Sequence, residues 1–155
     1  MWLLRRGEEP RPILREPKSG VGHEWWDPDG KHVWCIFDNE TWRVRVATGE
    51  IEKIGFPRNC WHSHSSLDGR LIVGDSIHGS TRGSASTLHF LNRNTGKNIV
   101  FVENPERKDY TGLNYHIDPH PRFVCNDEYV VFTTTVRGEI DVAIVPTVQL
   151  IEKTS

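Results

Sequence analysis

The chain lacks a long apolar run and an excess of basic residues, and each of these absences excludes a class of protein. Its formal net charge is -2 over 155 residues, which leaves no positive surplus for binding nucleic acid. Apolar stretches such as VWCIF and AIVP are far shorter than a membrane span, and the opening MWLL is followed at once by Arg5 and Arg6. We therefore expect a cytoplasmic protein with neither a membrane nor a nucleic acid as partner.

Cysteine is scarce, and its spacing excludes thiolate sites. Cys35, Cys60 and Cys125 form neither a disulfide framework nor a CxxC metal motif. Two of the three lie in or beside strand-like runs, where a free cysteine usually behaves as a small buried hydrophobic residue. The nucleophile elbow, the phosphate loop and the Rossmann fingerprint are also missing. We predict structural roles for all three cysteines.

Helical periodicity is absent as well, and short strand-like runs alternate with turns throughout. ATGE and NTGK stand in matching turns, and DPDG reads as a hairpin turn because it lacks the acidic spacing of a calcium loop. The chain is predicted to be all-β, with strands at 32–37, 41–46, 51–54, 70–75, 86–92, 98–102, 129–134 and 140–145.

The strands form a unit that is repeated along the chain, as in a β-propeller of four-stranded antiparallel blades. A propeller closes with several blades because only closure removes the exposed edges, and about three to three and a half are present here. We expect a piece of a longer propeller; the alternative is self-association with another copy to cover the open edges. The predicted single partial domain, 1–155, divides into the end of a preceding blade (1–22), three blades (23–58, 59–104 and 105–147) and a tail (148–155).

Three histidines stand in one register ahead of the repeated turn. His23 in HEWWDPDG, His62 in HSHSSLDG and His120 in HPRFVCND each precede a turn and then an apolar strand. Equivalent places in a radial repeat converge on the axis, and converging imidazoles make a metal site. The register therefore predicts that His23 and His120 are metal ligands, while His62 is either a ligand, a substrate contact or a structural histidine.

The segment HIDPHP offers further ligands. Alternate residues of an extended chain face the same way, so His116, Asp118 and His120 can present three ligands on one side. Imidazole with carboxylate suits manganese, iron or zinc. The alternative is a hydrogen-bonded beginning of a blade without a metal, in which His and Asp satisfy backbone groups.

Other polar residues are candidates for binding an anionic substrate. His64 shares an extended segment with His62, and Arg82 and Arg122 offer positive charge, although a solvated arginine is the commoner case. His32 and His89 are predicted to be structural, and the role of His78 stays open. The pair Trp25 and Trp26 is predicted to pack between blades.

The runs HEWWDPDG, HSHSSLDGRLIVGD, HIDPHPRF and VVFTTTVRGEIDVAIV resemble the C-terminal part of oligogalacturonate lyase, a seven-bladed propeller family of pectin breakdown. The resemblance implies that His23 and His120 match manganese ligands of the family. Asp118 stands where the family has a further ligand histidine, and Tyr115 stands where it has a glutamine, with His116 one position along. The implied cofactor is a divalent metal, Mn²⁺ above others, and the implied partner is an oligogalacturonide.

The resemblance also implies a reaction, in which the metal binds the uronate carboxylate and the 4-linked sugar leaves by β-elimination. The family's base is an arginine of an earlier blade that nothing in this chain matches. The leading hypothesis is thus a lyase-like metal-binding propeller portion whose isolated chain is inactive. The alternatives are a non-catalytic propeller segment that binds a sugar acid or a protein, and a different metal-dependent enzyme on the same scaffold.

Overall fold

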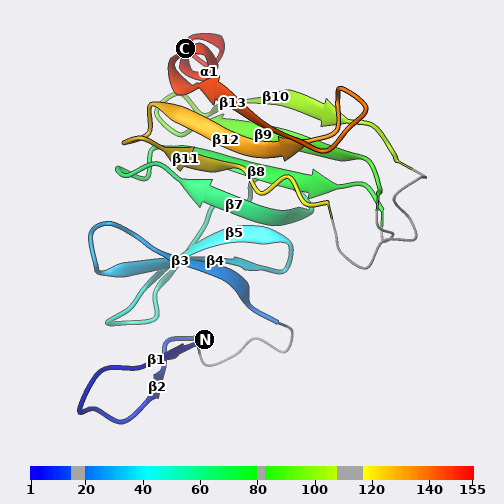
Figure 1. Cartoon of the computed structure of the whole chain (residues 1–155). Helices are drawn as coiled ribbons and strands as arrows, with labels where there is room; N and C mark the ends of the chain where they lie inside the picture. The colour runs from blue at the N-terminus through cyan, green and yellow to red at the C-terminus, as the bar shows by residue number, and fades with distance from the viewer. Residues whose placement is uncertain (15–19, 80–82, 108–116) are drawn as a thin grey trace.

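The structure is a computed structural model that describes residues 1–14, 20–79, 83–107 and 117–155. In these residues four antiparallel sheets stack in chain order, from the N-terminal ribbon to a C-terminal helix (Figure 1). Each larger sheet is a meander in which sequential strands pair. The prediction of all-β, propeller-like blades is therefore confirmed.

The sheets are named here by their strands. The ribbon contains β1 (Trp2–Leu3) and β2 (Arg11–Pro12). Blade 1 contains β3 (Gly22–Trp26), β4 (His32–Phe37), β5 (Glu40–Arg45) and β6 (Ile51–Lys53). Blade 2 contains β7 (Cys60–Ser65), β8 (Leu71–Ile77), β9 (Ser86–Asn92) and β10 (Lys97–Asn104). Blade 3 contains β11 (Arg122–Val124), β12 (Tyr129–Thr134) and β13 (Asp141–Pro146).

Within blade 1, β4 is buried on both faces, which explains its nearly continuous apolar sequence HVWCIF. Because successive residues of a strand face opposite sides, Val33 and Cys35 of β4 pack toward the N-terminal ribbon while Trp34 packs toward blade 2. Trp34 and Cys35 are fully buried, and burial raises the pKa of the Cys35 thiol to about 12. Cys60 is also buried, in agreement with its predicted structural role.

Blades 2 and 3 share a second core. Phe90 of β9 and Phe132 of β12 belong to one cluster with Leu150. Leu150 lies on a helix, α1 (Thr147–Lys153), which the sequence did not predict. Seven residues are too few to show a helical period, and the helix forms where Leu150 and Ile151 cover the core. No helix in the described part of the chain has the length and apolarity needed to cross a membrane.

The turns that follow β3 and β7 have the same backbone conformation. Gly30 and Gly69 adopt φ of 64° and 69°, and each donates its backbone N–H to the carbonyl three residues earlier. Both positions favour glycine because left-handed backbone is costly for other residues. The third turn instead uses three consecutive residues with positive φ, 125–127, and its hydrogen bond from Glu128 to Cys125 is displaced by one residue. Cys125 is consequently exposed rather than buried.

Candidate metal centre

Three histidines from three blades meet beside the inner strands. His23 lies in β3, His62 in β7, and His120 two residues before β11. Their ring centroids are 4.4 Å apart for His23 and His62, 3.5 Å for His62 and His120, and 6.0 Å for His23 and His120. One ring nitrogen from each lies within 4.8 Å of the other two. Nitrogens that bind one ion at about 2.1 Å stand roughly 3 to 4 Å apart, so small side-chain movements would complete the geometry.

Irregular backbone directs two of these rings out of the regular sheet. The β3–β4 pairing shifts between Gly22 and Trp25, and the β7–β8 pairing shifts between Cys60 and Ser63. These irregularities bracket His23 and His62, and a bulge is a common means of re-aiming a side chain near a functional site.

His23 and His120 also have positive φ, of 55° and 44°. Left-handed backbone costs about 1 to 2 kcal/mol at a residue other than glycine. Such strain persists only where the surrounding structure imposes it, and it gathers at functional sites. Two of the three histidines therefore have a backbone conformation that is costly for a residue other than glycine.

A buried carboxylate joins two of the three histidines. Asp75 in β8 is fully buried and accepts three hydrogen bonds. Its Oδ1 accepts the backbone N–H of His62 at 2.9 Å, and its Oδ2 lies 2.9 Å from Nδ1 of His62 and accepts the backbone N–H of His120 at 3.1 Å. When Nδ1 donates to the carboxylate, Nε2 of His62 keeps its lone pair for a metal.

The exposed pair of histidines is biased toward the neutral form. Burial lowers the pKa of His23, and the neighbouring His62 lowers it further, against the opposing charge of Asp75. The pKa of His120 is also lowered, mainly by burial and then by His62. Neutral imidazole is the form that binds metals. Since His62 is only 4% exposed while His23 and His120 are exposed, the cluster is closed on one side and open to solvent on the other.

The structure groups the predicted residues differently from the sequence. His62 joins the predicted ligands His23 and His120, whereas Asp118 is half-buried and lies outside the group of converging ligand atoms. The charge of Asp118 still opposes the lowered pKa of both His23 and His120. His116 and Arg82, predicted as a ligand and a substrate contact, lie outside the described residues.

His64 and Arg122 lie beside the cluster, at the contact between blades 2 and 3. The His64 ring stacks on Trp25 at 5.9 Å, and its Nδ1 accepts the backbone N–H of Phe123 at 3.4 Å. Burial, followed by the charge of Arg122, lowers the pKa of His64 to about 4. These are the contacts of a packing residue, and a substrate role for His64 or for the exposed Arg122 stays a prediction.

Only one member of the tryptophan pair packs between blades. Trp25 stacks on Trp34 at 5.8 Å and donates from Nε1 to Ser65 Oγ of blade 2 at 3.1 Å. Trp26 is 55% exposed, so the prediction was wrong for this residue. Neighbouring residues of a strand face opposite sides, so only one of the two can face blade 2.

A second acidic group, Asp27, Asp29 and His32, also brings its ligand atoms within 4.8 Å of one another. Its atoms are already engaged. Arg43 donates to Asp27 at 2.8 Å and to Asp29 at 3.2 Å, and Asp29 also lies 2.6 Å from Nδ1 of His32. The backbone N–H groups of Lys31 and His32 donate to the other Asp29 oxygen. The DPDG segment is thus a hairpin turn, as predicted, with its charge balanced by an arginine.

Asp75 is the site residue that sequence reasoning missed. Its only signal is a carboxylate at the end of the apolar run RLIVGD, where a strand residue two places from Val73 is expected to be buried. A buried carboxylate requires partners, but those partners lie on β7 and ahead of β11 and cannot be identified without the fold.

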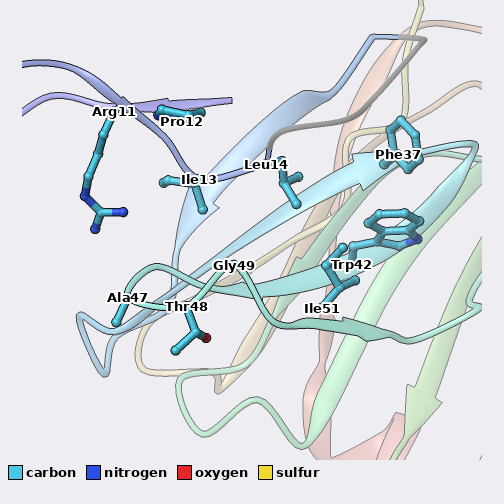
Figure 2. Close-up of a pocket in the computed structure, with 10 residues that line it drawn as sticks. All are labelled: Arg11, Pro12, Ile13, Leu14, Phe37, Trp42, Ala47, Thr48, Gly49 and Ile51. Atoms are coloured by element: carbon cyan, nitrogen blue, oxygen red, sulfur yellow. The ribbon is translucent and has the colours of Figure 1, made fainter.

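A cavity of about 520 Å³ lies away from the three-histidine cluster, between the N-terminal segment and blade 1 (Figure 2). Ile13, Leu14, Phe37 and Trp42 line it, together with the turn at Thr48 and Gly49. Arg11 is the only ionisable side chain that the described residues contribute to its wall, so these residues provide no acid and no metal ligand set there.

The sequence of the chain is similar to two curated lyases. The chain is 27% identical over 157 aligned residues to an oligogalacturonate lyase of Dickeya dadantii and 26% identical to an oligogalacturonide lyase of Pectobacterium atrosepticum. Each match covers 90% of this chain and 40% of the relative. No family model matches the chain. The resemblance inferred from the motifs is confirmed, and the chain spans 40% of the length of these curated relatives.

Solved structures support the same architecture. An oligogalacturonate lyase in complex with manganese superposes with a TM-score of 0.71 at 23% identity, over 94% of this chain and 40% of that one. The oligogalacturonate lyase of Vibrio parahaemolyticus gives 0.64 at 24% identity, over 94% of this chain and 41% of that one. TolB of Acinetobacter baumannii gives 0.63 at 15% identity, over 90% and 33%. These likenesses establish the fold.

Proposed function

We propose that this chain is the metal-binding portion of an oligogalacturonate lyase-like propeller that acts on oligogalacturonides in pectin degradation. The observation that carries the proposal is the convergence of His23, His62 and His120 from three blades. Similarity to two named oligogalacturonate lyases over 90% of the chain supports the substrate class.

The donor set fits a divalent cation, and we propose Mn²⁺. Three imidazoles with a nearby carboxylate suit manganese, iron or zinc, and manganese is the metal bound in a structural relative. His62 supplies Nε2 because Asp75 engages its Nδ1, while His23 and His120 lie on the open side. Three protein ligands leave coordination positions for a substrate, as in catalytic rather than structural sites.

When bound, such a cation supplies Lewis-acid chemistry, holding the uronate carboxylate and stabilising the charge that develops as the C5 proton leaves. The chain's own residues have a positioning task. Asp75 holds the His62 ring and the His120 backbone, so the relative placement of blades 2 and 3 fixes two ligands together. No described residue is assigned as the base that removes the C5 proton.

The first experiment measures metal binding by this chain. After dialysis against chelator, the protein is titrated with Mn²⁺ and the free ion is followed by electron paramagnetic resonance. We expect one equivalent to bind. No stoichiometric binding would exclude the proposed centre.

Catalysis is tested separately. The chain, and a protein that contains it together with the remaining blades of its relatives, are each supplied with Mn²⁺ and digalacturonate. A lyase forms a conjugated double bond between C4 and C5, which absorbs in the ultraviolet. No rise in absorbance from the larger protein would contradict the lyase assignment.

A non-catalytic sugar-acid-binding segment is the second candidate. It is favoured by Asp118 standing where the resemblance places a ligand histidine and by Tyr115 standing where it places a glutamine. Saturable digalacturonate binding by the Mn²⁺-loaded larger protein, without formation of the unsaturated product, would support this candidate over the lyase.

A further inference from the structure

A second cavity, of about 310 Å³, adjoins the three-histidine cluster and shares His23 with it. Its walls come from two blades. Blade 1 contributes residues 20–22, Ile36 of β4 and Asn39 of the turn between β4 and β5, and blade 2 contributes Cys60 and Trp61 of β7. Its volume is at the lower end of the range for small-molecule sites, about 300 to 1,000 Å³.

The wall has little charge and one large aromatic platform. Among the residues that the structure describes, His23 and Asn39 are the polar side chains of the wall, and no carboxylate, lysine or arginine lines it. Trp61 is 39% exposed although it stands next to the buried His62. An accessible indole face with a single amide suits the C–H face and hydroxyls of a sugar ring better than it suits a carboxylate.

The three-histidine cluster and the cavity thus suit different parts of a uronide. The three-histidine cluster suits the carboxylate through a metal, and the cavity suits the pyranose ring. We propose that Trp61 and this cavity form a sugar-ring subsite beside the metal centre, with the ring stacked on the indole. The subsite rests on the proposed function, because a uronide must first be the ligand of the site.

Trp26 provides a matched control for Trp61. Both are exposed tryptophans on innermost strands, at 55% and 39%, but Trp26 does not line the cavity. Trp61→Ala removes the platform and Trp61→Phe keeps a smaller one. Comparing each with Trp26→Ala separates a specific stacking contact from the general loss of an exposed indole.

The experiment measures two affinities for each protein: Mn²⁺ by electron paramagnetic resonance, and digalacturonate by calorimetry on the Mn²⁺-loaded protein. We expect Trp61→Ala to raise the digalacturonate Kd about tenfold and to leave the Mn²⁺ Kd unchanged, because the indole touches the ring and not the ion. Trp61→Phe should raise the digalacturonate Kd less, by about threefold, and Trp26→Ala should leave it unchanged.

The outcomes separate the two proposals. If the unmodified chain binds no Mn²⁺, the proposed function fails and the subsite fails with it. If Mn²⁺ binds but digalacturonate does not, or if Trp61→Ala and Trp26→Ala give equal digalacturonate affinities, the subsite is overturned while the metal centre stands.

Discussion

Among the described residues, two groups of ionisable side chains each bring their ligand atoms within 4.8 Å of one another, yet only one is suited to a metal. The cluster of His23, His62 and His120 draws on three blades, and the cluster of Asp27, Asp29 and His32 comes from a single turn and the strand after it. Distance alone does not distinguish them.

The difference lies in what the ligand atoms already bind. In the turn, Arg43 donates hydrogen bonds to the carboxylates of Asp27 and Asp29, and two backbone N–H groups donate to the other oxygen of Asp29. In the three-histidine cluster the counter-charge is Asp75, which engages Nδ1 of His62 and leaves Nε2 free. An imidazole nitrogen that is held by a buried carboxylate through the other ring nitrogen suits a cation, whereas the turn is already a closed ion-pair network.

The largest expected effect comes from removing one imidazole of the three-histidine cluster. His23→Gly deletes a ligand at a residue with φ of 55°, where glycine relieves strain instead of adding it. We expect Mn²⁺ affinity to fall by about 100-fold or more, above the roughly 10–100-fold loss typical of an outer partner. The apo protein should be at least as stable as the parent in urea unfolding. His32→Ala is the control, and an equal loss of affinity there would remove the distinction between the clusters.

A smaller loss of Mn²⁺ affinity is expected from Asp75→Asn, which keeps the shape of the side chain and removes its charge. The amide can present N–H to Nδ1 of His62, which would move the ring proton to Nε2 and block that ligand atom. We expect Mn²⁺ affinity to fall about 10–100-fold. Nitrogen-15 spectra of the His62 ring should show the change of tautomer in the apo protein. An unchanged tautomer with unchanged affinity would show that Asp75 has only a packing role.

The blades could be predicted because their signals are local. Strand alternation and turn residues identify 32–37, 86–92 and 129–134 with the bounds that the structure gives β4, β9 and β12. The shared histidine register likewise requires only a repeat. The sequence leaves His62 as a ligand, a substrate contact or a structural histidine. In the structure one of its ring nitrogens lies within 4.8 Å of ring nitrogens of His23 and His120, which favours the ligand role.

What could not be predicted depends on contacts between distant residues. Asp75 gains its role from His62 and His120, and α1 forms because Leu150 reaches the core between blades 2 and 3. The displacement of the third turn, at 125–127, could not be predicted from the sequence. Asp127 stands at the position of Gly30 and Gly69 in the repeat and has a similar φ, so the sequence register gives no sign of the shift. Long-range hydrogen bonds and packing decide each of these cases.

For the cluster of Asp27, Asp29 and His32, Arg43→Met tests whether its role is structural. The substitution leaves Asp27, which is nearly buried, without its charged donor. Hydrogen bonds to charged groups contribute about 1.5 to 3 kcal/mol, so we expect the free energy of unfolding to fall by about 2 kcal/mol. Arg45→Met, an exposed arginine on the same strand, is the control. Mn²⁺ affinity should not change, and a change would mean that the two clusters are coupled.

The smallest expected effect is a pH dependence confined to the turn. Burial works against the ionised form of Asp29, but hydrogen bonds from the backbone of Lys31 and from the side chain and backbone of His32 lower its pKa from 3.8 to about 2. A lowered pKa stabilises the fold at pH above the unfolded value and ceases to do so as pH falls through the folded one. Urea unfolding between about pH 4 and pH 2 should therefore show a steeper loss of stability for the parent than for Asp29→Asn. Carbon-13 titration of the Asp29 carboxyl gives the pKa directly, and parallel stability curves with an ordinary pKa would show that the network in the turn is weaker than its hydrogen bonds indicate.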